Sequence, residues 1–107
     1  MPKYLIQASY TAEGLKGLQK DKATGRRAAV AKAVEAVGGK VEAFYFAFGD
    51  YDVLAIVDLP DNVTAARLAV TISATGLACN KTTPLLTVEE TDQALQEGFG
   101  GYRGPGA

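Results

Sequence analysis

The chain has 107 residues, of which 48% are hydrophobic and 21% are charged, and its 11 basic and 12 acidic side chains give a formal net charge of -1. This composition is typical of one soluble globular domain; it excludes a disordered chain and argues against a nucleic-acid partner. The chain has no histidine, which removes the commonest general base and the usual protein ligand of zinc, iron and haem, so we expect no metal and no cofactor.

No targeting or membrane segment is predicted at the N-terminus. The apolar residues there give way to Gln7, which leaves a stretch too short for a signal peptide or a membrane span. Cys79 is the single cysteine and forms no internal disulfide, which fits a reducing compartment. We therefore expect a cytoplasmic protein without a membrane partner.

The first strand is predicted over Lys3 to Tyr10, and Thr11 is a suitable N-cap for the helix that follows. Glycines at positions 14, 17 and 25 weaken the start of this helix, so we expect a break or a mobile turn around residues 21–25. From Arg26 onward, valine and alanine recur at helical spacing until Gly38-Gly39 ends the helix.

Residues 40–48 and 51–59 are predicted to form two antiparallel strands, joined by a tight hairpin turn at Gly49-Asp50. A second helix follows, with Asp61 as its cap and Gly76 at its end. The fourth strand, residues 77–86, carries several polar side chains, and Pro84 restricts it to an edge or a bulge.

A capping box at Thr87 and Glu90 predicts a short third helix. The glycine-rich residues 98–107 that follow it are predicted to be a flexible tail, which leaves residues 1–97 as the folded domain.

The order strand, helix, strand, strand, helix, strand predicts an α+β fold of ferredoxin-like βαββαβ type, with both helices on one face of a four-stranded antiparallel sheet. The two middle strands are apolar on both sides. In residues 40–48, Val41, Ala43, Tyr45 and Ala47 alternate with Phe44, Phe46 and Phe48; in residues 51–59, Leu54 and Ile56 oppose a second apolar set. Leaving the apolar side chains on the face away from the helices in water would cost several kcal/mol. We therefore expect a second copy of the chain or an apolar ligand to cover that face.

The segment Phe48-Gly49-Asp50-Tyr51-Asp52, together with the opening Tyr4-Leu5-Ile6 and the late Lys81-Thr82-Thr83, resembles the GYD-domain family, small bacterial and archaeal proteins of unknown function. The resemblance covers about residues 3–95. It implies a dimeric α+β barrel, whose relatives include cofactor-free monooxygenases, muconolactone-type isomerases, haem enzymes and amino-acid-sensing domains. Such a fold hosts many chemistries, so the resemblance implies an architecture more than an activity.

Three groups of residues are candidates for a site. Asp50, Tyr51 and Asp52 could supply a proton acceptor and a donor for catalysis, or simply build the turn. Tyr4 and Tyr45, with the phenylalanines of the second strand, could line an aromatic ligand cavity or belong to the core and a subunit contact. Asn80, Lys81 and Thr82 could bind an anionic ligand or mark a solvated edge.

The pair Arg26-Arg27 is a further candidate, either as a clamp for a carboxylate or phosphate or as part of a solvated helix face. Two functions remain open on these grounds. The first is a homo-oligomeric binding or regulatory module, a dimer or larger, that holds a small molecule without transforming it. The second is a cofactor-independent isomerase or monooxygenase that acts on a small, partly aromatic substrate.

Overall fold

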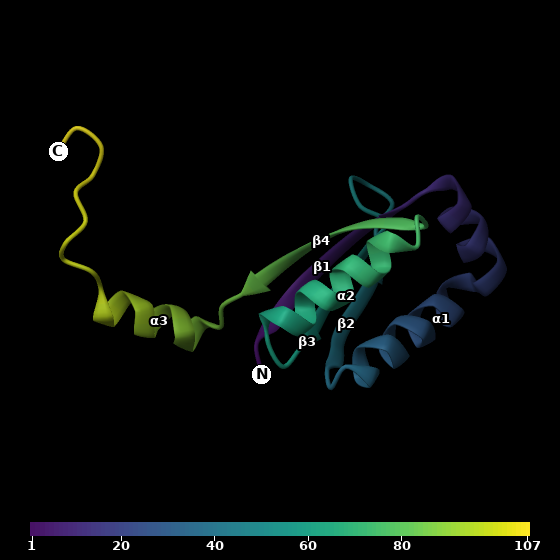
Figure 1. The fold of residues 1–107 in the computed structure, drawn as a ribbon, viewed down its shortest axis with the longest axis horizontal. Helices are drawn as coiled ribbons and strands as arrows, with labels where there is room; N and C mark the ends of the chain where they lie inside the picture. Colours follow the sequence, from purple (N-terminus) through teal and green to yellow (C-terminus); the bar gives the residue numbers. More distant parts are fainter.

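The computed structural model describes all 107 residues as four strands and three helices. The elements are β1 (Lys3–Tyr10), α1 (Ala12–Ala36), β2 (Lys40–Phe46), β3 (Val53–Asp58), α2 (Asn62–Ala74), β4 (Ala78–Leu85) and α3 (Val88–Glu97). The strands form one antiparallel sheet in the order β2-β3-β1-β4, and α1 and α2 lie against one face of it (Figure 1). The predicted ferredoxin-like α+β fold is confirmed.

The core lies between the sheet and these two helices. Eight buried residues form it: Tyr4, Ile6, Val34, Ala55, Val57, Leu59, Ala65 and Leu68. Alternate residues of β1 and β3 supply the sheet side, because successive side chains of a strand point to opposite faces. The buried sides of the strands and of the two helices therefore meet in one apolar layer.

Helix α1 changes direction at Lys22, whose φ of 64° and ψ of 169° are not helical. The break predicted for residues 21–25 is therefore confirmed. The Thr11 side chain caps the helix by accepting a hydrogen bond from the Gly14 N–H at 3.2 Å. At the other end, Gly38 takes a φ of 83°, a left-handed conformation that glycine adopts without a Cβ penalty.

The pairing of β2 with β3 contains a bulge between Val41 and Ala43. Val41 lies opposite Val57 and Phe44 opposite Ala55, so both Val41 and Phe44 pack against the core. The prediction that Val41 shares a side with Ala43 and Tyr45, opposite Phe44, is wrong. A bulge adds one residue to a strand and moves the following side chains to the other face.

The connection between β2 and β3 is longer than predicted. It runs over residues 47–52, and Phe48 within it has a φ of 56°, which is unusual for a residue other than glycine. The Ala47 N–H donates to the Asp52 carbonyl at 2.9 Å and closes the loop. A two-residue turn at Gly49-Asp50 is therefore wrong, and the strands end at Phe46 and begin again at Val53.

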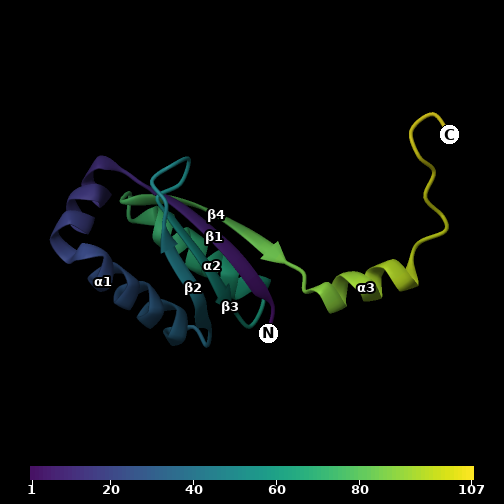
Figure 2. The same cartoon turned by 180° about the vertical axis from the view of Figure 1, so that it is seen from behind.

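The second face of the sheet carries no helix (Figure 2). Leu5, Leu54 and Ile56 lie on this open face half-buried, and Tyr45, opposite Leu54, is 69% exposed. The Lys3 ammonium on the same face lies 2.8 Å from Asp58 Oδ1 and 3.0 Å from Glu42 Oε2. The hydrogen bond to Asp58, and then that to Glu42, raise the pKa of Lys3 above its ordinary value of 10.5.

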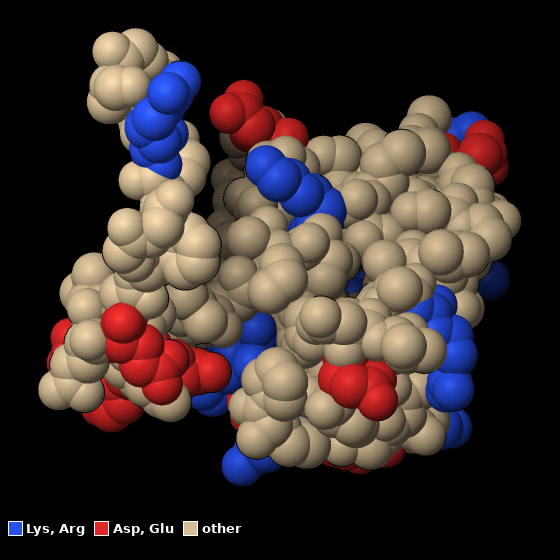
Figure 3. Space-filling view, turned by 60° about the vertical axis from the view of Figure 1, so that its left-hand side comes forward, with Lys and Arg blue, Asp and Glu red and all other residues tan.

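Helix α3 and the residues after it project from the body of the molecule as an arm (Figure 1). The radius of gyration is 17.0 Å, whereas a compact chain of this length has about 13 Å. The predicted capping box is present, with Thr87 and Glu90 bonding to each other's backbone N–H. Acidic side chains gather on the helix (Figure 3), which carries Glu89, Glu90, Asp92 and Glu97. None of the three helices is both long and apolar enough to cross a bilayer.

Candidate functional site

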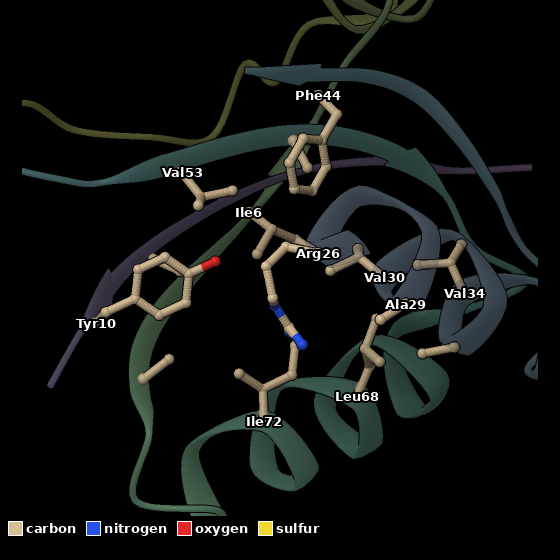
Figure 4. A pocket seen from close by; sticks show the side chains of 14 residues that line it. Ile6, Tyr10, Arg26, Ala29, Val30, Val34, Phe44, Val53, Leu68 and Ile72 are labelled. Atoms are coloured by element: carbon tan, nitrogen blue, oxygen red, sulfur yellow. The ribbon is translucent and has the colours of Figure 1, made fainter. Parts of the chain in front are cut away.

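An apolar cleft of about 140 Å³ lies between the sheet and helices α1 and α2 (Figure 4). All four strands and both helices contribute to it, and 13 of its 14 lining residues are hydrophobic. The lining residues are Ile6, Ala8, Tyr10, Arg26, Ala29, Val30, Ala33, Val34, Phe44, Val53, Ala55, Leu68, Ile72 and Ala78. The floor of the cleft is therefore the core side of the sheet, and its walls are the two helices.

Small side chains make the space. Ala8, Ala55 and Ala78 are buried at the floor, where larger residues would fill the volume. On α1, Ala29 and Ala33 border the cleft and are exposed, so they stand at its mouth. Alanine is a strong helix former and a common buried residue, so the positions of these alanines in the sequence do not predict a cleft.

Arg26 is the only charged residue in the lining. It follows the break in α1, and its side chain extends into the cleft between the sheet and α2 (Figure 4). Its Nη1 lies 3.6 Å from Asp21 Oδ2, while its Nε is buried and has no hydrogen-bond partner. A buried N–H group without an acceptor costs about 1–3 kcal/mol, and this one belongs to a side chain that lines the cleft.

A second hollow of about 240 Å³ adjoins the first. The two share Tyr10, Arg26, Ile72 and Ala78. The outer hollow is more polar, because five of its nine lining residues are not hydrophobic; these are Gly14, Gly17, Asp21, Arg26 and Thr75. Since α1 bends at Lys22, residues from both of its segments border this hollow. Arg26 thus stands between an apolar inner space and a polar outer one.

The aromatic candidates Tyr4 and Tyr45 lie on opposite sides of the sheet. Tyr4 is only 1% exposed and is part of the core, where its hydroxyl donates a hydrogen bond to Asn62 Oδ1 at the start of α2. Tyr45 is on the open face of β2. Neither lines the cleft, whose aromatic residues are Tyr10 and Phe44.

The polar candidates of β4 are also divided. The Asn80 side chain donates to the Ala69 carbonyl at 2.9 Å and to Ser73 Oγ at 2.8 Å, both on α2. Thr82 donates to Asn80 Oδ1 at 3.1 Å, so these two residues tie the edge strand to the helix. Lys81 lies between them in the strand and is exposed on the open face.

The candidates Asp50, Tyr51 and Asp52 lie in the loop between β2 and β3, outside the cleft lining. Asp52 Oδ2 accepts a hydrogen bond from the Tyr10 N–H at 2.8 Å, and the Asp50 carbonyl accepts one from the Ser9 hydroxyl at 3.2 Å. The Tyr51 carbonyl accepts from the Gly49 N–H at 3.1 Å. These bonds fasten the loop to the end of β1.

Sequence reasoning pointed to Arg26 as a possible anion clamp but missed the alanines and the two isoleucines around it. The signal that would have found them is a set of small residues that coincide on the buried sides of several elements. That coincidence depends on the strand order β2-β3-β1-β4 and is not visible along the chain.

The family model described as GYD domain matches residues 4–95. The match spans the sheet except for Lys3, together with α1, α2 and most of α3. No curated protein and no solved structure matches the chain. Because the family model covers most of the sequence, from Tyr4 in the first strand to Leu95 in the last helix, this chain belongs to the GYD-domain family.

Proposed function

We propose that this protein is a cytoplasmic, homo-oligomeric module that binds a small, largely apolar molecule in the cleft between its sheet and its two packed helices. The observation that carries the proposal is the cleft itself, with 13 hydrophobic residues among the 14 that line it. Small-molecule sites are concave and mostly apolar, with a few polar groups that fix orientation.

The size of the cleft limits the ligand. An apolar protein cavity of about 150 Å³ accommodates benzene, and the cleft here measures about 140 Å³. A ring or a short branched chain therefore fits the inner space. Such a ligand would displace poorly bound water and remove apolar surface from solvent, which contributes about 25 cal/mol per Å².

The lining supports binding rather than catalysis. An isomerase or monooxygenase without a cofactor needs a proton acceptor beside its substrate. Arg26 is the only charged group in the lining and, as a permanent cation, cannot serve as that acceptor. The carboxylate of Asp52, in the loop between β2 and β3, already accepts a hydrogen bond from the Tyr10 N–H.

The experiment measures the binding of toluene, with ligand-observed NMR as the detection method. We expect wild-type protein to bind toluene and the variant Ala29→Leu to lose most of this binding, because the larger side chain extends over the cleft. Ala28→Leu is the matched control, since Ala28 is an exposed neighbour on α1 outside the lining. Equal toluene binding by both variants, or none by the wild type, would contradict the proposal.

The open face of the sheet is the basis for proposing a homo-oligomer. Leu5, Leu54 and Ile56 form an apolar surface there without a covering helix. Leu86 before the arm is also exposed, and the arm adds exposed Val88, Leu95 and Phe99. Burying such surfaces between copies would stabilise a domain of this size, whose own core is small. We propose that the open faces of two copies pack together.

Native mass spectrometry of Leu54→Lys tests this arrangement. We expect the wild type to be a dimer or larger and Leu54→Lys to be a monomer, because the charge would be buried without a partner. Val70→Lys is the control, since Val70 is 67% exposed on α2 at the other side of the molecule. A wild-type monomer would refute the oligomer while leaving the cleft untouched.

A further inference from the structure

We propose that the ligand of the cleft is an amphiphilic monocarboxylate, held with its apolar part in the inner space and its carboxylate on Arg26. This inference rests on the proposed binding function and names the class of ligand. Three features support it: the unpartnered Nε of the Arg26 guanidinium, the position of Arg26 between two hollows, and the charge on the outer side.

The guanidinium of Arg26 is only partly satisfied by the protein. Asp21 approaches Nη1 at 3.6 Å, a long distance for an ion pair, and both side chains are partly exposed, at 33% for Arg26 and 45% for Asp21. The Nε atom is buried and has no partner. Together with Nη2, Nε forms the side edge of the guanidinium, whose two parallel N–H groups match the two oxygens of a carboxylate.

Arg26 lies where the head of a bound amphiphile would be. Arg26 borders both hollows, the apolar inner cleft and the more polar outer one. A ligand with its ring between Leu68 and Phe44 would place its head group beside Arg26 and facing the outer hollow. The Tyr10 ring also borders both hollows, and its hydroxyl points toward the space beside Arg26 (Figure 4), where it would add a second donor.

The outer hollow favours a single negative charge. Its only other ionisable side chains are Asp21 and Tyr10, so a dianionic head group such as a phosphate would meet the Asp21 carboxylate. A like charge at short range weakens binding. A cationic ligand would meet Arg26 itself. The arrangement therefore selects a monoanion, and the planar fork of Arg26 selects a carboxylate among monoanions.

The experiment compares phenylacetate, the neutral phenylacetamide and toluene on the full chain by calorimetry. We expect the wild type to bind phenylacetate at least ten times more tightly than phenylacetamide. The variant Arg26→Met should lose this preference and bind toluene within threefold of the wild type. The variant Arg26→Lys keeps the charge but not the fork, and we expect it to recover only part of the affinity for phenylacetate.

Arg27→Met is the matched control, because Arg27 is exposed beside Arg26 and does not line the cleft; it should bind phenylacetate like the wild type. Thermal unfolding of each variant shows whether it is folded. Toluene binding without a preference for phenylacetate over phenylacetamide would overturn this inference alone. Unchanged phenylacetate binding by Arg26→Met would also overturn it, and a wild type that binds none of the three compounds would overturn the proposed function as well.

Discussion

The Asp52 carboxylate accepts a hydrogen bond from the backbone N–H of Tyr10 at 2.8 Å, just beyond Ala8 and Val53, the last regular pair of β1 and β3. The side chain takes the place of a backbone carbonyl in the ladder. We predict that Asp52→Ala lowers the free energy of unfolding by about 1–2 kcal/mol, because it leaves this N–H without its acceptor. Urea unfolding measures the change, and Asp52→Asn, which retains an acceptor oxygen, should lose less.

The control for this prediction is Asp50→Ala. Asp50 bonds to β1 through its backbone carbonyl, so removal of its side chain should change stability by less than about 0.5 kcal/mol. If Asp52→Ala were as stable as Asp50→Ala, the bond to Tyr10 would contribute nothing measurable.

Gly14 lies against the chain that enters β4. A Cβ built at Gly14 would be 1.9 Å from the Leu77 carbonyl oxygen, whereas one at Gly17 would meet nothing within 4 Å. We predict that Gly14→Ala destabilises the protein by at least about 2 kcal/mol, since backbone must move. Gly17→Ala should stabilise it by about 0.5–1 kcal/mol, because alanine favours the helix. Thermal unfolding compares the two variants. If Gly14→Ala unfolded at the same temperature as Gly17→Ala, the close approach of Gly14 to the Leu77 carbonyl would be ruled out.

Asn80 joins the edge strand β4 to helix α2 through two donated hydrogen bonds. We expect Asn80→Ala to cost about 1–3 kcal/mol, because the Ala69 carbonyl and Thr82 hydroxyl lose a partner in a partly buried position. Lys81→Ala, on the exposed side of the same strand, should cost less than about 0.5 kcal/mol. Chemical unfolding distinguishes them; equal stabilities would mean that Asn80 holds nothing in place.

Asp61 caps α2 by accepting a hydrogen bond from the Thr64 N–H at 2.8 Å, and this bond lowers the pKa of Asp61 below its ordinary value of 3.8. The ionised cap therefore stabilises the folded state above pH 3.8, and the contribution is lost as the pH falls through the lowered pKa. We predict that the stability difference between the wild type and Asp61→Ser, whose cap does not titrate, is constant from pH 7 to about pH 5 and then moves against the wild type in acid. A difference that stayed constant down to about pH 2 would show that the carboxylate contributes nothing through its charge.

The sequence was sufficient for the order of the elements, the caps at Thr11, Asp61 and Thr87, and the break near Lys22. These features depend on local preferences: which side chains bond to a nearby N–H, where glycine weakens a helix, and how apolar residues repeat. The ferredoxin-like sheet followed from that order, because few topologies connect such elements with short, right-handed crossovers.

Tertiary structure alone decided the bulge between Val41 and Ala43, the partners of Asn80 and the cleft around Arg26. Each depends on how separate elements pack against one another. A bulge exists only relative to the facing strand, and a polar strand residue such as Asn80 finds its acceptors only once α2 lies over it. In the sequence, Arg26 and Arg27 are two similar neighbouring arginines. Packing exposes Arg27 to water and places Arg26 in the cleft, where small alanines on three strands leave the space open.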